Sequence, residues 1–135
     1  LCTDCRAPVD APDETLDELV RDWRHAGAGL ADLPSDDALR ADWRHRHGVE
    51  GGRLLLYRAV GCPRCDGTGY RGRAGLHELM PISRPLKALI QTGRRADELL
   101  STAMAEGMRT LRQDGIEKVV AGVTTLDEVR AVTNG

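Results

Sequence analysis

The four cysteines of this chain form two pairs with the same spacing, and no other feature constrains the fold as strongly. The pairs are Cys2 with Cys5 and Cys62 with Cys65. Two intervening residues allow both sulfurs of a pair to face one centre, and two such pairs supply the four thiolates of a closed tetrahedral Zn²⁺ site. The sequence therefore predicts one structural zinc ion held by all four cysteines, with no position left for a substrate water.

Other uses of a C-x-x-C pair fit the sequence less well. A pair used in thiol exchange usually begins a helix, whose dipole lowers the thiol pKa. Here Pro8 follows the first pair and a glycine run follows the second. Paired C-x-x-C motifs without further cysteines also suit a reducing compartment better than a secreted disulfide scaffold. A redox dithiol and uncoordinated thiols are the alternatives to zinc.

A long stretch of chain separates the two pairs. Closing the loop of 56 residues between Cys5 and Cys62 costs on the order of 3–4 kcal/mol. Zinc binding, at about 10–16 kcal/mol in peptides, exceeds this cost. It cannot order every residue of the loop, because each one costs about 1–2 kcal/mol in backbone entropy. We therefore expect the residues between the pairs to pack on their own helices or to stay mobile.

Composition and patterning predict an α+β chain with a mainly aliphatic core. The sequence is 41% apolar and contains no Phe, two Trp and two Tyr. We expect a small β-containing zinc module over residues 1–82, with an acidic helical insert at 13–52. A helical C-terminal subdomain is expected over residues 83–135.

Local signals place two helices in the insert. Thr15-x-x-Glu18 has the pattern of a capping box, and Ser35 can begin a second helix. The tetrapeptide Asp-Trp-Arg-His occurs at 22–25 and again at 42–45. We predict that its two tryptophans anchor the insert in a core. Its histidines, with His47, are interpreted as surface residues rather than metal ligands.

The rest of the chain is predicted to contain two strands and then four helices. The strands are expected at 53–60 and 76–82, on either side of a glycine-rich turn. The helices are expected at about 83–93, 97–106, 110–121 and 125–132, in a compact bundle. Gly115 lies inside the third helix and weakens that prediction by about 1 kcal/mol relative to Ala.

Charge is unevenly distributed along the chain, although the net charge is only −2. Residues 53–95 contain nine Lys or Arg and two Asp or Glu, which gives +7. Residues 1–52 and 96–135 have net charges of −6 and −3. The basic segment either meets an anion or, more commonly, faces the acidic ends of its own chain or of a neighbouring subunit.

Signals for catalysis and for membrane insertion are missing from the sequence. It contains no G-x-x-x-x-G-K-[ST] phosphate loop and no G-x-S-x-G nucleophile elbow. No apolar run approaches the roughly 20 residues that span a bilayer, and no signal peptide is present. We therefore expect a soluble chain that is not an enzyme by itself.

Three long segments carry a resemblance to a known family. They are YRAVGCPRCDGTGYRGRAGLHEL at 57–79, EGMRTLRQDG at 106–115 and KVVAGVTTLDEV at 118–129. In this order after a first C-x-x-C, they resemble the C-terminal region of the type II secretion and type IV pilus assembly ATPases. The resemblance covers residues 1–5 and about 53–133. Residues 13–52 depart from the family pattern, which leaves the role of the insert open.

This resemblance implies a zinc site and a parent protein. Cys2, Cys5, Cys62 and Cys65 match the family's tetracysteine zinc site. The parent would be a cytoplasmic hexameric ATPase, peripheral to the inner membrane, that drives pilin or pseudopilin extraction through a membrane platform protein. ATP and Mg²⁺ would bind upstream, because the family's nucleotide-site motifs do not occur here. The chain begins at Leu1 without Met, which we interpret as a fragment of such a parent.

The implied role of the chain is structural. Zinc would act as a clasp, and the chain would brace the ATPase and present a surface to neighbouring subunits or to the platform protein. Three basic residues are the candidate contact: Arg64, Arg71 and Arg73. No nucleic-acid partner is expected.

Two other kinds of zinc protein share part of the pattern. Cys62-x-x-Cys65-x-Gly67-x-Gly69 resembles one unit of the cysteine-rich domain of Hsp40-type cochaperones, but that domain needs four such units. A nucleic-acid-binding zinc ribbon is supported only by the basic segment. The long spacing and the lack of aromatic stacking residues oppose it. A free-standing ribbon or a cochaperone-like binding module is thus the alternative interpretation.

Overall fold

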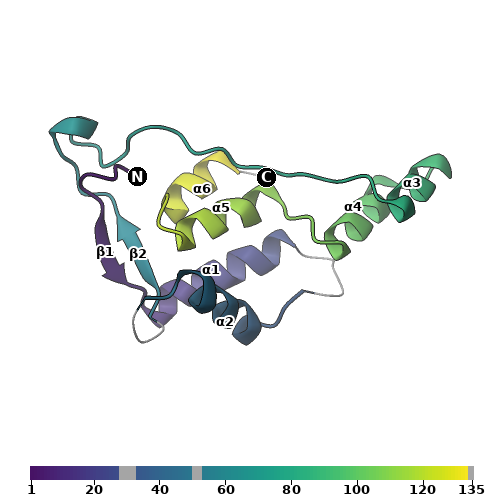
Figure 1. Ribbon diagram of the computed structural model, residues 1–135, viewed down its shortest axis with the longest axis horizontal. Coiled ribbons are helices and arrows are strands. Elements are labelled where there is room, and N and C mark those ends of the chain that lie inside the picture. The colour runs from purple at the N-terminus through teal and green to yellow at the C-terminus, as the bar shows by residue number, and fades with distance from the viewer. Residues whose placement is uncertain (28–32, 50–52, 134–135) are drawn as a thin grey trace.

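The computed structural model describes residues 1–27, 33–49 and 53–133 of an α+β chain, as predicted. Its elements are β1 (Ala7–Asp10), α1 (Asp13–Ala26), α2 (Asp36–His47), β2 (Leu55–Arg58), the 3-10 helix η2 (Pro63–Cys65), α3 (Arg84–Gln91), α4 (Ala96–Ala105), α5 (Leu111–Val120) and α6 (Leu126–Val132) (Figure 1). No helix within the described residues is long and apolar enough to cross a bilayer.

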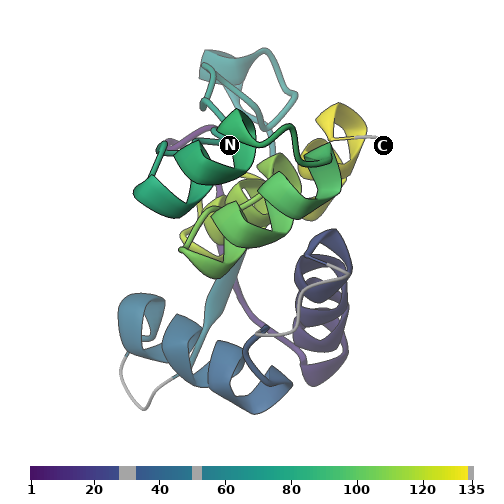
Figure 2. The same cartoon turned by 90° about the vertical axis from the view of Figure 1, so that its right-hand side faces the viewer.

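A short antiparallel ribbon of β1 and β2 runs from the cysteine turns to the insert. Ala7 pairs with Arg58 next to the cysteines, and Asp10 pairs with Leu55 next to the insert. The strand prediction for 53–60 is confirmed at its centre, whereas β1 was not predicted because prolines flank and interrupt it. Pro8 is tolerated because each strand of a two-stranded sheet has one free edge. Figure 2 shows η2 and the insert helices at opposite ends of the molecule.

The insert forms two helices that begin differently. Ser35 Oγ accepts a hydrogen bond from Ala38 N–H at 3.1 Å, which confirms the predicted start of α2. The predicted capping box at Thr15 is wrong, because α1 already begins at Asp13 after Pro12 and has no side-chain cap. Acidic residues in the first turn of α1 take over part of this role by interacting favourably with the helix dipole.

One apolar core joins the insert to the last two helices. Trp23 and Trp43 are 2% and 0% exposed, which confirms both as core anchors. The buried residues of this core are Leu16, Leu19, Val20, Trp23, Leu39, Trp43, Leu54, Ile116, Val119, Val120 and Val129. The insert therefore packs on α5 and α6 as well as on itself, and the core draws on both sides of residue 82.

Polar contacts fix the same packing in detail. Gln113 is fully buried, and its side-chain amide donates to Trp23 O at 3.2 Å. Its Oε1 accepts from Thr110 N–H at 3.0 Å as part of a capping box that begins α5. Trp43 Nε1 donates to Glu117 Oε1 at 3.2 Å. Hydrogen bonds thus join α5 to the backbone of Trp23 and to the side chain of Trp43.

The four C-terminal helices form two pairs rather than the predicted compact bundle. In Figure 1, α3 and α4 lie together at one end, apart from α5 and α6. Ser83 Oγ caps α3 through Leu86 N–H at 3.3 Å, as its sequence predicted. Gly115 packs so closely on α6 that an added Cβ would lie 2.5 Å from Val129 Cγ1. This contact explains a glycine inside α5.

The predicted strand at 76–82 is wrong. These residues run in an extended path without a ladder partner among the described residues, whose single sheet is the β1–β2 ribbon. The segment is held at the start of α5 instead. His77 N–H donates to Asp114 Oδ2 at 2.9 Å, and Glu78 Oε1 accepts from Leu111 N–H at 3.2 Å. A strand-like sequence pattern becomes a strand only where another strand pairs with it.

Candidate metal centre

Two tight turns position the four cysteines at one end of the ribbon. In the first turn, Arg6 N–H donates to Cys2 O at 3.0 Å. In the second, Cys65 N–H and Gly67 N–H donate to Cys62 O at 3.2 and 2.9 Å. Such turns aim both side chains of a C-x-x-C pair toward one side. The structure therefore brings together all four cysteines that the sequence singled out.

Three of the sulfur–sulfur distances match a tetrahedral thiolate site. The four Sγ atoms lie within 4.8 Å of one another. The Sγ–Sγ distance is 3.8 Å between Cys2 and Cys62, 3.8 Å between Cys5 and Cys65, and 3.7 Å between Cys62 and Cys65. Zn–S bonds of about 2.3 Å place the sulfurs of a tetrahedron about 3.8 Å apart. A disulfide would require about 2.05 Å, so these are free thiols with the spacing of metal ligands.

The surroundings make the four thiols unequal. Burial opposes ionisation of Cys65, but the N–H groups of Cys62 and Gly69, each 3.2 Å from its sulfur, outweigh this effect. Together with the neighbouring Cys62 and Cys5 thiols, they lower the pKa of Cys65 to about 6. Burial raises the pKa of Cys5 to about 12. The N–H groups around Cys65 thus favour the thiolate form, which is the form that binds a metal ion.

Gly69 contacts both cysteine turns and was not among the predicted site residues. Its φ is +83°, and an added Cβ would lie 2.5 Å from Ala59 Cβ. Its carbonyl accepts from Cys2 N–H at 2.9 Å while its N–H reaches Cys65. The glycine run after Cys65 is the sequence signal of this close approach.

The same glycine run has the spacing G-x-G-x-x-G at residues 67–72. A dinucleotide-binding loop with this spacing lies between a strand and a helix, so that a helix N-terminus meets the pyrophosphate. Here the run follows η2 and leads into the extended segment. Its glycines therefore serve the cysteine turn and do not form a dinucleotide site.

Contacts on the other side attach the cysteine turns to α5 and α6. The Arg6 guanidinium lies 4.2 Å from the centre of the Tyr57 ring and donates to Gly122 O. Tyr70 and Thr125 hydroxyls are 3.0 Å apart. These contacts link the cysteine end of the ribbon to the turn between the last two helices.

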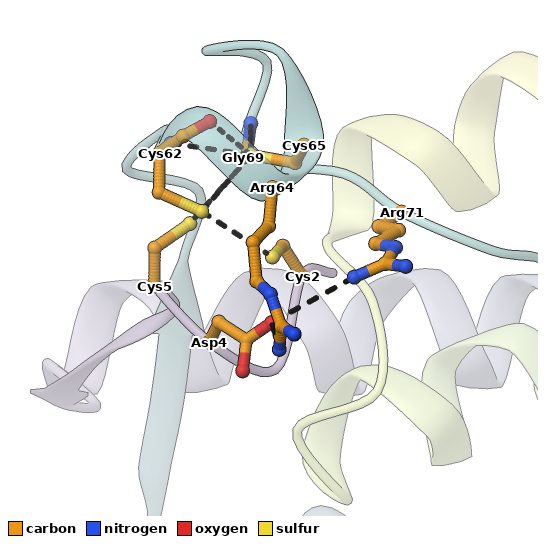
Figure 3. A network of polar contacts seen from close by, with 8 residues as sticks. All are labelled: Cys2, Asp4, Cys5, Cys62, Arg64, Cys65, Gly69 and Arg71. Carbon is orange, nitrogen blue, oxygen red and sulfur yellow. Dashed lines mark hydrogen bonds and ion pairs between the residues drawn. The ribbon is translucent and has the colours of Figure 1, made fainter.

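The three arginines of the predicted contact differ in their surroundings. Arg64 and Arg71 lie 3.2 and 3.8 Å from Asp4 Oδ2, close to the cysteines (Figure 3). Arg73 makes no ion pair with the described residues and lines a cavity of about 500 Å³ beside α5 and α6. Their role as a partner contact stays a prediction. Asp4 was overlooked, although opposite charges in the two C-x-x-C gaps signal this pairing.

The histidines do not add ligands to the site. His25, His45 and His77 are exposed, and His47 is half-buried. Within the described ranges, the cysteine cluster is the single group of three or more potential ligands. The surface interpretation of the insert histidines agrees with their exposure.

Comparisons with known proteins place this site in a family. Residues 1–131 match the family described as Type II/IV secretion system protein. The Type IV pilus assembly ATPase PilB of Thermus thermophilus is 41% identical over 100 residues, which cover 74% of this chain and 11% of that protein. The Type II secretion system ATPase E of Vibrio cholerae is 41% identical over 80 residues, covering 59% and 16%.

A third relative aligns along almost the whole chain. The Type IV pilus assembly ATPase PilB of Acinetobacter baylyi is 30% identical over 134 residues, which cover 99% of this chain and 19% of that protein. Its alignment extends across residues 13–52, so this relative has a segment that aligns with the insert. This chain spans less than a fifth of each of these three relatives. The chain belongs to the type II/IV secretion system protein family.

Proposed function

We propose that the four cysteines bind one structural Zn²⁺ and that the chain is a C-terminal structural and interaction part of a secretion or pilus assembly ATPase. Three sulfur–sulfur distances of 3.7–3.8 Å carry this proposal, because they match the edge of a zinc tetrathiolate within about 0.1 Å, and all four sulfurs lie within 4.8 Å of one another. With four thiolate ligands, the ion has no open position for a substrate. The metal would therefore hold the chain together rather than catalyse a reaction.

The residues around the site indicate which elements the zinc ion would hold together. Zinc would tie the start of β1 to the end of β2 through the two cysteine turns. The Arg6 contacts with Tyr57 and Gly122 would pass this order to the turn between α5 and α6. The zinc site would thus fix the ribbon against the helical core. It would also offset the cost of closing the loop between Cys5 and Cys62, which is on the order of 3–4 kcal/mol.

The wider role follows from family membership. Relatives are named as ATPases of type IV pilus assembly and type II secretion. The parent would be a cytoplasmic hexamer, peripheral to the inner membrane, with ATP and Mg²⁺ bound outside these 135 residues. Neighbouring subunits and an inner-membrane platform protein would be its partners, with Arg64, Arg71 and Arg73 as the candidate contact. This chain alone would not hydrolyse ATP.

Metal analysis of the purified chain under reducing conditions tests the proposal. We expect one zinc per chain and less than about 0.2 zinc in the Cys65→Ser variant. Zinc below about 0.2 per wild-type chain would contradict the tetrathiolate site. ATP turnover by the wild-type chain alone would contradict the assignment of catalysis to the rest of the parent.

A further inference from the structure

An acidic side chain between two basic ones lies beside the sulfur cluster. Asp4 occupies the gap of the first C-x-x-C pair, and Arg64 occupies the gap of the second. Arg64 Nη1 donates to Asp4 Oδ2 at 3.2 Å, and Arg71 Nη1 lies 3.8 Å from the same oxygen. Figure 3 shows both guanidinium groups directed at this carboxylate. These three residues are here called the Asp4 cluster.

The Asp4 cluster connects the two turns without using a sulfur. The other contacts between the turns involve the thiols themselves or the backbone, such as Cys2 N–H to Gly69 O at 2.9 Å. The three side chains are 41–68% exposed, so solvent and salt screen their attraction. Exposed ion pairs contribute little individually, but here two of them share one carboxylate and bridge the turns that hold the ligands.

We propose that the Asp4 cluster holds the two cysteine turns together and thereby slows both the release of bound zinc and the attack of reagents on the thiols. The zinc half of this proposal rests on the proposed function of the cysteines. Four thiolates around one Zn²⁺ carry a net charge of −2, which the arginines partly offset while Asp4 keeps them in place. These are positioning residues, because they act through the cysteines.

The direction of the effect separates bridging from a simple charge effect. If these residues acted only through their charge on the thiolates, losing Asp4 and losing Arg64 would change zinc release in opposite directions. A bridge predicts the same direction for both, because either loss breaks the same ion pair. Loss of both Asp4 and Arg64 should then accelerate zinc release no more than loss of Asp4 alone.

Zinc transfer from the loaded chain to an excess of a chromophoric chelator measures this directly. At low salt, Asp4→Asn and Arg64→Gln should each release zinc about two- to fivefold faster than wild type. The double variant should match Asp4→Asn. In 1 M NaCl, where the Debye length is about 3 Å, the rates should converge. Arg58→Gln is the matched control, since this exposed residue carries the same charge without an ion pair among the described residues, and its rate should equal wild type.

Thiol alkylation of the metal-free chain supplies a second measurement that does not need zinc. The Asp4→Asn and Arg64→Gln variants should react faster by a similar factor, and Arg58→Gln should not. Rates that are unchanged, or that move in opposite directions for the two variants, would overturn the proposal. Wild-type zinc content is read separately, so a missing metal would reject the proposed function while the alkylation rates still decide on the Asp4 cluster.

Discussion

The two ends of the β1–β2 ribbon are held in different ways. At the insert end, Trp23, Trp43 and Leu19 are almost fully buried in a core shared with α5 and α6. At the cysteine end, Cys2 and Cys65 are buried, and the surrounding order comes from turns, N–H contacts to sulfur and exposed ion pairs. Apolar burial can stabilise the first end without a ligand, whereas the proposed zinc ion would add to the order of the second. Substitutions at each end of the ribbon can separate apolar burial from metal coordination.

The largest effect is expected from Trp43→Ala at the insert end. Removing this fully buried side chain leaves a cavity and deprives Glu117 of its indole donor. The free energy of unfolding should fall by about 3–5 kcal/mol. Urea unfolding of the zinc-loaded chain measures it, with His45→Ala on the exposed face of α2 as the control. A loss below about 1 kcal/mol would show that the core is not the source of stability at this end.

A smaller and more local effect is expected from Gly69→Ala at the cysteine end. The new Cβ would lie 2.5 Å from Ala59 Cβ and 3.0 Å from Val60 N, which displaces the N–H that reaches Cys65. We expect zinc affinity to fall about 10- to 100-fold, as for other losses around metal ligands. Competition with a chelator of known affinity provides the measurement.

Gly72→Ala is the matched control for this change. Gly72 also has a positive φ, +77°, but an added Cβ there would meet nothing within 4 Å. Any effect of backbone strain alone should appear in both variants, and the loss of the sulfur contact only in Gly69→Ala. Equal zinc affinities of the two variants would refute the importance of the Gly69 contact.

The smallest expected effect concerns pH and the contact between the extended segment and α5. Burial raises the pKa of Asp114, but hydrogen bonds from Lys118 and from His77 N–H prevail and lower it. Since the folded pKa lies below the unfolded one, the carboxylate stabilises the fold above about pH 4 and loses this effect as pH falls through the folded value. Asp114→Asn should cost less than about 1 kcal/mol at pH 7, because the pair is partly exposed.

Unfolding of the metal-free chain between pH 7 and pH 2 measures this difference without interference from zinc loss. The difference in the free energy of unfolding between wild type and Asp114→Asn should disappear at the acid end of this range. A difference that grows as pH falls would contradict the sign of the pKa shift.

Features set by neighbouring residues were predictable from the sequence, and features set by distant pairing were not. The caps at Ser35 and Ser83 depend on residues within one helical turn, and both are confirmed. The meeting of the two cysteine pairs is an exception, because their matched C-x-x-C spacing predicted it although the pairs lie 60 residues apart. β1 was missed because its prolines argue against a strand and its partner lies about 50 residues away. Thr15 failed as a cap because Pro12, at the end of the ribbon, places the helix start earlier.

A Co²⁺ titration of the reduced, metal-free chain, followed by absorption spectroscopy, tests the tetrathiolate site most directly. We expect saturation at one Co²⁺ per chain, with thiolate-to-metal charge transfer and the intense visible bands of tetrahedral coordination. Cys65→Ser should weaken the bands and shift them. A spectrum typical of six oxygen or nitrogen ligands, or no saturable binding, would contradict a tetrathiolate site that clasps the two cysteine turns.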